Sequence, residues 1–219
     1  KKSSCTFELS IYELITKSNI VTSDRKKNNI AHMPKKQATT RIIGGSLRGS
    51  KLPYKQNKSI RPTESKTKET LFNWLMNNLE GKTCLDMFAG TGSLGIEALS
   101  RGADKVVFIE KQKSQTDALK SNLERLKVNQ SSHVLNANVF SVDFDNLPYQ
   151  FDLLFIDPPF RENLIQRSLD FIKSKNILSP KALIYLECEK ELNLIEITEG
   201  LNLLKDSKGG QTHYCLYES

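Results

Sequence analysis

The stretch Thr83–Leu94, TCLDMFAGTGSL, constrains the fold of this chain more than any other part of the sequence. Apolar residues lead into Asp86, a run of small residues follows at 89–92, and a helical pattern begins near Leu94. This order predicts a strand, a tight glycine turn and a helix. Glycine lets the backbone approach a ligand, and the start of a helix offers unpaired N–H groups. In an open α/β sheet, such a junction binds nucleotide-like ligands.

The remainder of the chain alternates predicted strands and helices. Further strands are expected at 105–110, 134–138, 151–157, 182–189, 202–205 and 212–217, and helices at 64–78, 94–101, 114–127 and 162–173. The segment 151–157 is almost continuously apolar, which is typical of a central parallel strand. We therefore predict an α/β, Rossmann-like fold with a mostly parallel seven-stranded sheet, helices on both faces, right-handed crossovers and a closing antiparallel strand.

The N-terminal part differs in composition from the rest. Residues 1–38 are expected to be a peripheral or disordered segment, and residues 1–32 to have an origin outside the natural protein, because Met33 would make a natural start. Residues 39–62 are expected to be a basic β-hairpin extension with strands at 41–45 and 47–53. Residues 63–219 would then form the catalytic domain.

Positive charge is concentrated before the glycine turn. Residues 34–70 carry ten Lys or Arg against two Glu, whereas residues 71–219 carry 16 basic against 20 acidic side chains, within a net charge of +7 for the whole chain. This asymmetry indicates a polyanionic partner such as a nucleic acid, although a solvated basic tail remains an alternative.

Cysteine and histidine usage argues against two kinds of site. The four cysteines are far apart with no C-x-x-C pair, and the three histidines are scattered, so we expect no cysteine–histidine cluster, no disulfide scaffold and no metal site. No apolar run approaches the length of a membrane span and no signal peptide is evident, so a cytoplasmic protein without membrane contact is expected.

Three features fall where predicted strands end, at the ligand edge of such a sheet. The first is the turn itself, and D-x-F-A-G-T-G resembles the nucleoside-binding loop of S-adenosylmethionine-dependent methyltransferases. The second is Glu110, which can accept hydrogen bonds from a ribose diol; alone it could equally be a charged strand end. The third is Asn138 with Val139, where methyltransferases contact adenine. The candidate cofactor residues here are Asp86, Phe88, Ala89, Gly90, Thr91, Gly92, Glu110, Asn138 and Val139.

The stretch Asp157-Pro158-Pro159-Phe160 carries the acceptor chemistry. It resembles the [D/N/S]-P-P-[F/Y/W] motif of methyltransferases that act on planar exocyclic amines. Such an amine is a poor nucleophile because its lone pair is delocalised into the ring. Hydrogen bonds to the Asp157 carboxylate and the Pro158 carbonyl would aim that lone pair at the methyl donor, and Phe160 would stack on the base. We predict Asp157, Pro158 and Phe160 as catalytic residues, with Asp157 also bordering the cofactor.

Most of the chain, from Arg41 onward, resembles the RsmD family of bacterial 16S ribosomal RNA guanine-N2 methyltransferases. The matching segments are Gly45–Pro53, Arg61-Pro62-Thr63, Glu69–Leu75, Leu85–Gly95, Glu97–Gly102, Asp157–Phe160 and Ala182–Glu187. The resemblance implies a class I methyltransferase that uses S-adenosylmethionine, releases S-adenosylhomocysteine and acts on 16S rRNA of the small ribosomal subunit. We expect the protein to be a monomer.

Two roles of the N-terminal segments follow from the resemblance. It implies that Arg61, Pro62 and Thr63 line the cofactor site and that the basic hairpin engages RNA. Within that hairpin, Arg48, Lys51, Lys55 and Lys58 would bind phosphates without sequence preference.

Two alternatives stay open at this point. The D-P-P-F motif alone also allows an adenine-N6 or other amino methyltransferase acting on DNA or RNA. From a different class, the chain could be a non-catalytic RNA-binding assembly factor that retains the fold.

Overall fold

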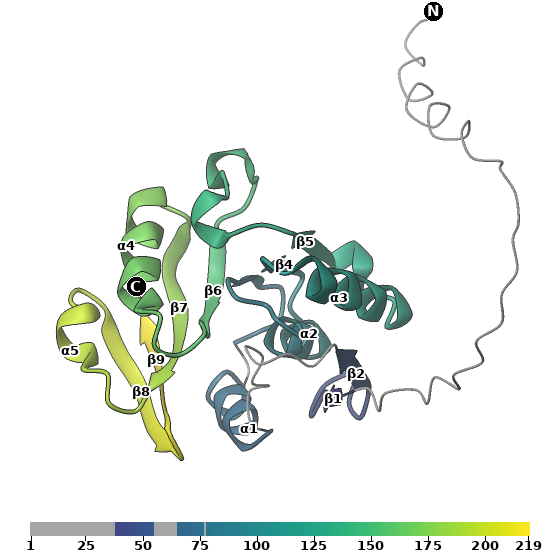
Figure 1. Cartoon of the computed structure of the whole chain (residues 1–219), viewed down its shortest axis with the longest axis horizontal. Coiled ribbons are helices and arrows are strands. Elements are labelled where there is room, and N and C mark those ends of the chain that lie inside the picture. Colours follow the sequence, from purple (N-terminus) through teal and green to yellow (C-terminus); the bar gives the residue numbers. More distant parts are fainter. Residues whose placement is uncertain (1–37, 55–64, 77) are drawn as a thin grey trace, which may run out of the picture. The chain divides into compact units, whose positions relative to one another are not determined.

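The computed structural model describes residues 38–54, 65–76 and 78–219, all of which lie in one compact unit, residues 36–219. Its centre is a seven-stranded sheet in the order β5-β4-β3-β6-β7-β9-β8 (Figure 1). The strands of this sheet are β3 (Thr83–Asp86), β4 (Lys105–Ile109), β5 (Ser132–Leu135), β6 (Phe151–Ile156), β7 (Leu178–Glu189), β8 (Asn202–Gly209) and β9 (Thr212–Glu218). Strands β3 to β7 pair in parallel, and β9 pairs antiparallel with both β7 and β8.

The strand order reverses between β3 and β6. From β3 the chain proceeds to β4 and then β5 on one side, and it returns to place β6 and then β7 on the other side. Loops that leave β3 and β6 therefore diverge, which opens a crevice at the carboxyl ends of these two neighbouring strands. The glycine turn follows β3 and the Asp157–Phe160 segment follows β6, so both border that crevice.

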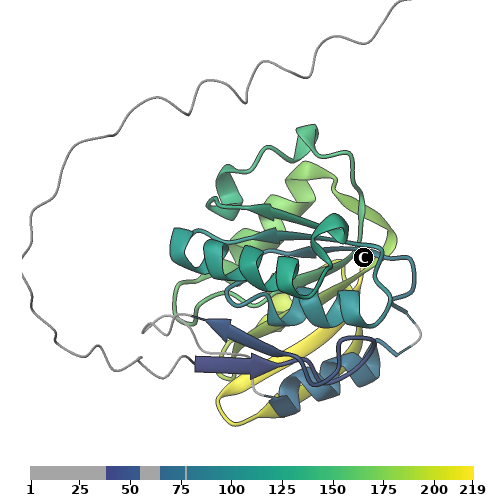
Figure 2. The ribbon, with the colours of Figure 1, turned by 90° about the vertical axis from the view of Figure 1, so that its right-hand side faces the viewer.

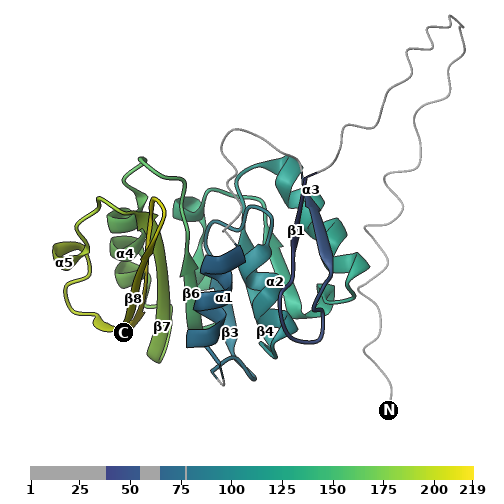
Figure 3. The ribbon, with the colours of Figure 1, turned by 90° about the horizontal axis from the view of Figure 1, so that it is seen from below.

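Helices cover both faces of the sheet. The helices are α1 (Ser65–Trp74), α2 (Ser93–Ser100), α3 (Lys113–Arg125), α4 (Leu164–Lys175) and the short α5 (Leu194–Ile197), with 3-10 turns at Asn129–Ser131, Val139–Ser141 and Phe144–Asn146. Side chains of α1, α2 and α3 share one apolar cluster, whereas α4 and α5 pack into a second. In Figure 3, α4 and α5 lie at the β7–β9 end, and α1, α2 and α3 lie toward the N-terminal hairpin. No helix of the described residues is long and apolar enough to cross a membrane.

Alternation along the central strands explains the two clusters. Val106 and Phe108 of β4 belong to the cluster of α1–α3, while Val107 and Ile109 belong to that of α4 and α5. Successive side chains of a strand point to opposite faces, so a strand covered on both sides needs apolar residues at every position. The predicted fold class, a mostly parallel seven-stranded sheet with helices on both faces and a small N-terminal hairpin, is confirmed.

The hairpin is present, but its strands were placed wrongly from the sequence. Strand β1 (Ala38–Arg41) pairs antiparallel with β2 (Lys51–Tyr54), and residues 42–50, expected to be mostly strand, form the connection between them. The backbone of this connection bonds to α2 instead of to a second strand: Ser46 N donates to the Ser100 carbonyl at 2.7 Å. Figure 2 shows the hairpin beside α3, where the Asn122 side chain donates to the Pro53 carbonyl at 3.0 Å.

A buried carboxylate joins the hairpin connection to the sheet domain. Glu97 of α2 is fully buried and accepts hydrogen bonds from the backbone N–H groups of Ile43 (2.8 Å) and Gly44 (2.7 Å). Arg101 donates to the same carboxylate at 2.9 Å, and Lys68 Nζ of α1 lies 3.7 Å from it. Lys68 is also fully buried and donates to Ser93 Oγ at 2.9 Å and to the Arg41 carbonyl. Burial lowers the pKa of Lys68, and Glu97 opposes that shift.

We predict that Glu97→Gln destabilises the protein by about 3 kcal/mol, because it leaves the Lys68 ammonium buried without its counter-charge. The double variant Lys68→Met with Glu97→Gln should recover much of that loss. Chemical denaturation measures both free energies of unfolding, with Glu124→Gln on the exposed side of α3 as the charge-matched control. A cost for Glu97→Gln no larger than that of Glu124→Gln would contradict the prediction.

Candidate functional site

A cavity of about 530 Å³ lies at the carboxyl ends of β3, β4, β6 and β7. It brings together residues that are up to 126 positions apart in the chain, from Asp86 to Thr212. Most of the site residues predicted from sequence line it: Asp86, Phe88, Ala89, Gly90, Thr91, Glu110, Asn138, Val139, Asp157, Pro158 and Phe160. The glycine turn and the D-P-P-F segment thus face one shared space.

Glu110, which follows β4, shapes the glycine turn. Its carboxylate accepts the Gly90 N–H at 2.9 Å through one oxygen and the Gln112 N–H at 2.6 Å through the other. The side chain is 8% exposed and lines the cavity. A carboxylate offers about four acceptor positions, so these two bonds leave capacity toward a ligand. Glu110 therefore fixes the turn and presents an anionic acceptor beside it.

Asp86 lies deeper than the sequence suggested. Its carboxylate is 3% exposed and accepts the Gly95 N–H of α2 at 3.2 Å. Burial raises the pKa of Asp86 to about 7, and the neighbouring Glu110 adds to the increase, while the Gly95 hydrogen bond opposes it. The side chain ties the end of β3 to the start of α2 from the floor of the cavity.

The two glycines of the turn serve different purposes. Gly90 adopts a positive φ of 52° and borders the cavity, and a Cβ there would meet only the Phe88 carbonyl oxygen, at 3.9 Å. Gly92 has a φ of 74°, and a Cβ there would lie 2.3 Å from Leu119 Cδ1 of α3. Gly92, predicted to bind the cofactor, is not among the residues that line the cavity. It lets α3 pack closely behind the turn.

The segment after β6 is held in an unusual backbone conformation. Asp157 and Phe160 are partly exposed to the cavity and Pro158 is buried. The next residues include Arg161 with a φ of 64° and Asn163 with a φ of 52°, the left-handed region that non-glycine residues rarely adopt. The Arg161 N–H donates to the Glu189 carboxylate at the end of β7. Such strain persists only where surrounding contacts enforce it and is found frequently at functional sites.

Asn138 caps a short helical turn. Its side-chain oxygen accepts the Phe140 N–H at 3.1 Å, so this oxygen is already engaged in local structure. The Phe140 ring packs edge-on against Phe88 at 6.4 Å between centroids, and the Arg167 guanidinium lies 3.9 Å from its centre. Sequence reasoning missed Phe140 and Arg167, which both line the cavity, because neither belongs to a recognisable motif.

The remaining predicted site residues fall into two groups. Arg61, Pro62, Thr63, Lys55 and Lys58 lie outside the described residues. Arg48 and Lys51 are exposed on the hairpin, and neither lines the cavity.

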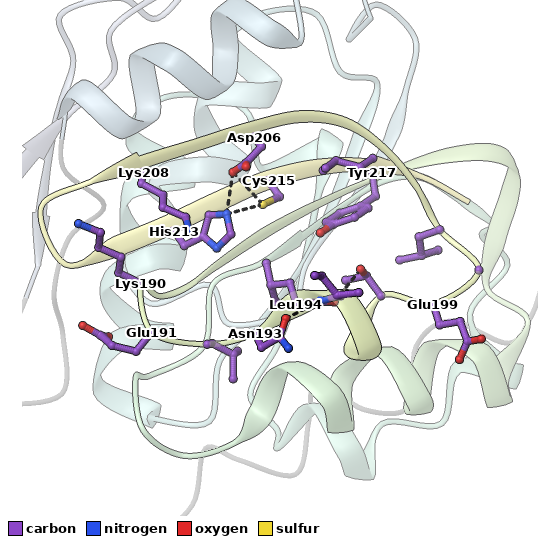
Figure 4. A pocket seen from close by; sticks show the side chains of 16 residues that line it. Lys190, Glu191, Asn193, Leu194, Glu199, Asp206, Lys208, His213, Cys215 and Tyr217 are labelled. Atoms are coloured by element: carbon purple, nitrogen blue, oxygen red, sulfur yellow. Dashed lines mark hydrogen bonds and ion pairs between the residues drawn. The ribbon is translucent and has the colours of Figure 1, made fainter.

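A second cavity, of about 630 Å³, lies between the β8–β9 ribbon and α5. Three side chains point toward one another there (Figure 4): His213 Nε2 lies 2.6 Å from Asp206 Oδ1 and 3.2 Å from Cys215 Sγ. The expectation that no cysteine–histidine cluster exists is therefore wrong, since His213 and Cys215 alternate along one strand and share a face. Asp206 Oδ1 accepts hydrogen bonds from His213 Nε2 and Cys215 Sγ. Hydrogen bonding therefore accounts for the close approach of these three side chains.

Comparison with known proteins gives consistent matches. The family model described as "Conserved hypothetical protein 95" matches residues 40–218. A protein of Haemophilus influenzae named ribosomal RNA small subunit methyltransferase D is 44% identical, with 85% of this chain and 97% of that protein covered. Its Escherichia coli namesake is 38% identical, with 81% and 89% covered. The solved structure of a putative methyltransferase from Escherichia coli is 37% identical with a TM-score of 0.72, and it covers 83% of this chain and 98% of its own.

The raised pKa of Asp86 predicts a pH-dependent stability. Between pH 3.8 and about 7 the unfolded chain loses the Asp86 proton while the folded protein keeps it, so folding becomes less favourable as pH rises. We predict that Asp86→Asn gains stability over the parent from pH 4 to pH 7, by up to about 4 kcal/mol, and that the difference stays constant above pH 7.

Thermal unfolding without ligand across this pH range measures the effect, and Asp104→Asn, an exposed carboxylate, is the matched control. A difference between Asp86→Asn and the parent that does not change with pH would contradict the burial argument.

Proposed function

Because this chain belongs to the RsmD family, whose model is described as "Conserved hypothetical protein 95", we propose that it transfers a methyl group from S-adenosylmethionine to the N2 amine of a guanine in 16S rRNA. The small ribosomal subunit or its assembly intermediate is the substrate, and S-adenosylhomocysteine is the second product. Methylation of small-subunit rRNA is supported by the names of relatives at 38–44% identity. Guanine and its N2 atom are the finer part of the proposal and rest on the chemistry of the site.

One observation carries the proposal: the turn after β3 and the D-P-P-F segment after β6 line the same cavity. A nucleoside ligand needs a turn that it can approach closely, and an amine acceptor needs fixed hydrogen-bond acceptors. Here both are next to each other at the point where strand order reverses. A protein that only binds RNA has no need of this juxtaposition, and that favours the enzyme over the assembly factor.

The residues present fit the methyl donor. Glu110 would accept the ribose hydroxyls, the turn from Asp86 to Gly90 would face the nucleoside and amino-acid parts, and Asn138 with Val139 would border the adenine. The hydrophobic rings of Phe88 and Phe140 offer a face to a flat base. The resemblance adds Arg61, Pro62 and Thr63 to this group. When bound, the sulfonium ligand supplies an activated methyl group.

Residues of the D-P-P-F segment would prepare the acceptor. The Asp157 carboxylate and the Pro158 carbonyl accept hydrogen bonds from the exocyclic amine, which turns the nitrogen lone pair toward the methyl group and favours the positive charge that develops on nitrogen. Phe160 covers the base that has been extruded from its stack. Two prolines cannot donate to the sheet and have little conformational freedom, so these acceptors stay in place.

Basic residues of the hairpin would hold the RNA. Arg48 in the hairpin connection and Lys51 at the start of β2 are exposed, and Lys55 and Lys58 follow in the sequence. Lys and Arg at such positions neutralise phosphates and contribute affinity without reading sequence. The base-specific part of recognition is then left to the cavity.

The substrate class is tested by transfer of tritiated methyl groups. We expect label in small-subunit particles from a strain that lacks this gene, less label in naked 16S rRNA and none in duplex DNA. Mass spectrometry of the labelled rRNA should identify N2-methylguanine. Label in DNA alone, or in adenine, would refute the proposal.

We predict that Asp157→Ala keeps its affinity for S-adenosylhomocysteine within about threefold but loses at least about a hundredfold in methyl transfer, since only the acceptor loses a hydrogen-bond partner. Calorimetry gives the affinity, and single-turnover transfer gives the rate.

Glu110→Ala is the opposite case, in which the affinity for S-adenosylhomocysteine falls by about tenfold or more. Full activity of Asp157→Ala would remove Asp157 from the catalytic role, and an unchanged affinity of Glu110→Ala would remove Glu110 from the ribose assignment.

A further inference from the structure

The cavity contains a buried carboxylate to which the proposed reaction gives no task. Glu187 is close to the carboxyl end of β7, is 6% exposed and lines the cavity together with Asp157, Pro158 and Phe160. A buried carboxylate needs polar partners, and the Tyr185 hydroxyl is one of those of Glu187. Its place on the acceptor side of the cavity, away from the glycine turn, suggests a role toward the base.

Strand register places Glu187 next to Asp157. In the parallel pair of β6 and β7, Phe155 is opposite Tyr185 and Ile156 is opposite Leu186, so the next residues along the two strands are Asp157 and Glu187. Neighbouring strands lie about 4.8 Å apart. Both carboxylates act electrostatically on the Tyr185 hydroxyl, which shows that both lie close to that group. The two acids therefore stand side by side at one edge of the sheet.

A tyrosine fixes the orientation of Glu187. The Tyr185 hydroxyl donates to Glu187 Oε2 at 2.8 Å, and the Tyr185 side chain is fully buried, with its ring against Phe155 at 6.4 Å between centroids. Burial, followed by the charges of Glu187 and Asp157, raises the pKa of Tyr185 well above its usual value, so this hydroxyl remains a neutral donor. A carboxylate offers about four acceptor positions on its two oxygens, so Glu187 can serve several donors at once.

We propose that Glu187 is the residue that selects guanine, by accepting the N1–H of the base whose N2 amine is held by Asp157. This inference rests on the proposed function. The Watson–Crick edge of guanine presents adjacent N1–H and N2–H₂ donors, and two neighbouring carboxylates are the complement of two neighbouring donors. An extruded base is read on this edge by hydrogen bonds.

The same arrangement rejects other amino bases. In adenine and cytosine the ring nitrogen beside the exocyclic amine, on its Watson–Crick side, carries a lone pair and no hydrogen. A carboxylate oxygen of Glu187 would then lie opposite the lone pair of that ring nitrogen, and both are acceptors. A buried polar group left without its partner costs binding free energy. The motif after β6 can serve any planar amine, so the discrimination would come from β7.

The inference can be tested on the parent enzyme with a base analogue. Once mass spectrometry has located the methylated guanine, particles are assembled from ligated 16S rRNA with guanine or 2-aminopurine at that position. The analogue keeps the amine at C2 but has a lone pair at N1. We expect the parent to methylate guanine at least about tenfold faster than 2-aminopurine in single-turnover reactions. Equal rates on the two bases would overturn the inference and leave the proposed function intact.

The variant Glu187→Gln provides the second measurement. Its amide oxygen can still accept from Tyr185, while its NH₂ group can donate to the N1 lone pair of 2-aminopurine. We expect slower transfer to guanine and a guanine-to-2-aminopurine rate ratio at least about fivefold smaller than in the parent. Glu196→Gln, on the exposed face of α5, removes the same charge and should keep the ratio of the parent.

The outcomes separate the two proposals. If the parent methylates no guanine, the proposed function fails. If it methylates guanine but Glu187→Gln keeps the ratio of the parent, only the role of Glu187 fails. Calorimetric affinity for S-adenosylhomocysteine checks that Glu187→Gln is folded; if that variant does not fold, the rate ratio of the parent decides, because it needs no variant.

Discussion

The arrangement of this protein depends on the buried carboxylate of Glu97. This side chain of α2 accepts two backbone N–H groups of the hairpin connection and the guanidinium of Arg101. It also forms an ion pair with Lys68 of α1. Lys68 in turn reaches Ser93, the first residue of α2, directly after the glycine turn. A rearrangement of the hairpin would therefore disturb a buried ion pair that also supports the turn. Under the proposed function, this network joins the RNA-binding extension to the cofactor site by direct contact.

The reversal of strand order decides where chemistry can take place. Within the described part of the chain, β3 and β6 are the one pair of neighbouring strands whose following segments diverge. The glycine turn follows β3 directly, and the D-P-P-F segment follows β6 directly. Because β7 is the next strand outward, its end adds Glu187 to the acceptor side, as β4 adds Glu110 to the turn side. The sheet thus orders the residues of the cavity from the β4 side to the β7 side: Glu110, Asp86, Asp157, Glu187. Under the proposed function, this order separates a cofactor half from a base half.

The sequence predicted the structure best where the spacing of apolar residues and the residue types of a turn indicate the same element. The almost continuously apolar run 151–156 and the D-M-F-A-G-T-G turn predict β6, β3 and the cavity, since a parallel sheet covered on both faces accommodates such a run. It failed at the hairpin, where Ile42 and Ile43 suggest strand but their backbone groups bond to Ser50 and Glu97. Sequence reasoning also missed the contact of Asp206 with His213 and Cys215. This contact depends on the register of β8 against β9, which no local sequence pattern specifies. Residues such as Arg167, which reach the cavity from a helix surface, carry no local signal.

Acidic and basic side chains are concentrated in different parts of the protein. Five acidic and two basic side chains line one cavity, while the segment before the glycine turn carries the excess of basic side chains. Such a cavity repels phosphate and attracts a cationic ligand, because in a partly desolvated site charges are only weakly screened. Under the proposed function, the backbone of the nucleic-acid strand would lie on the basic hairpin while a neutral base turns inward. The proposed substrate therefore suits the distribution of charge as well as the motifs: the base enters, the phosphates stay outside, and the positively charged donor is held among acids.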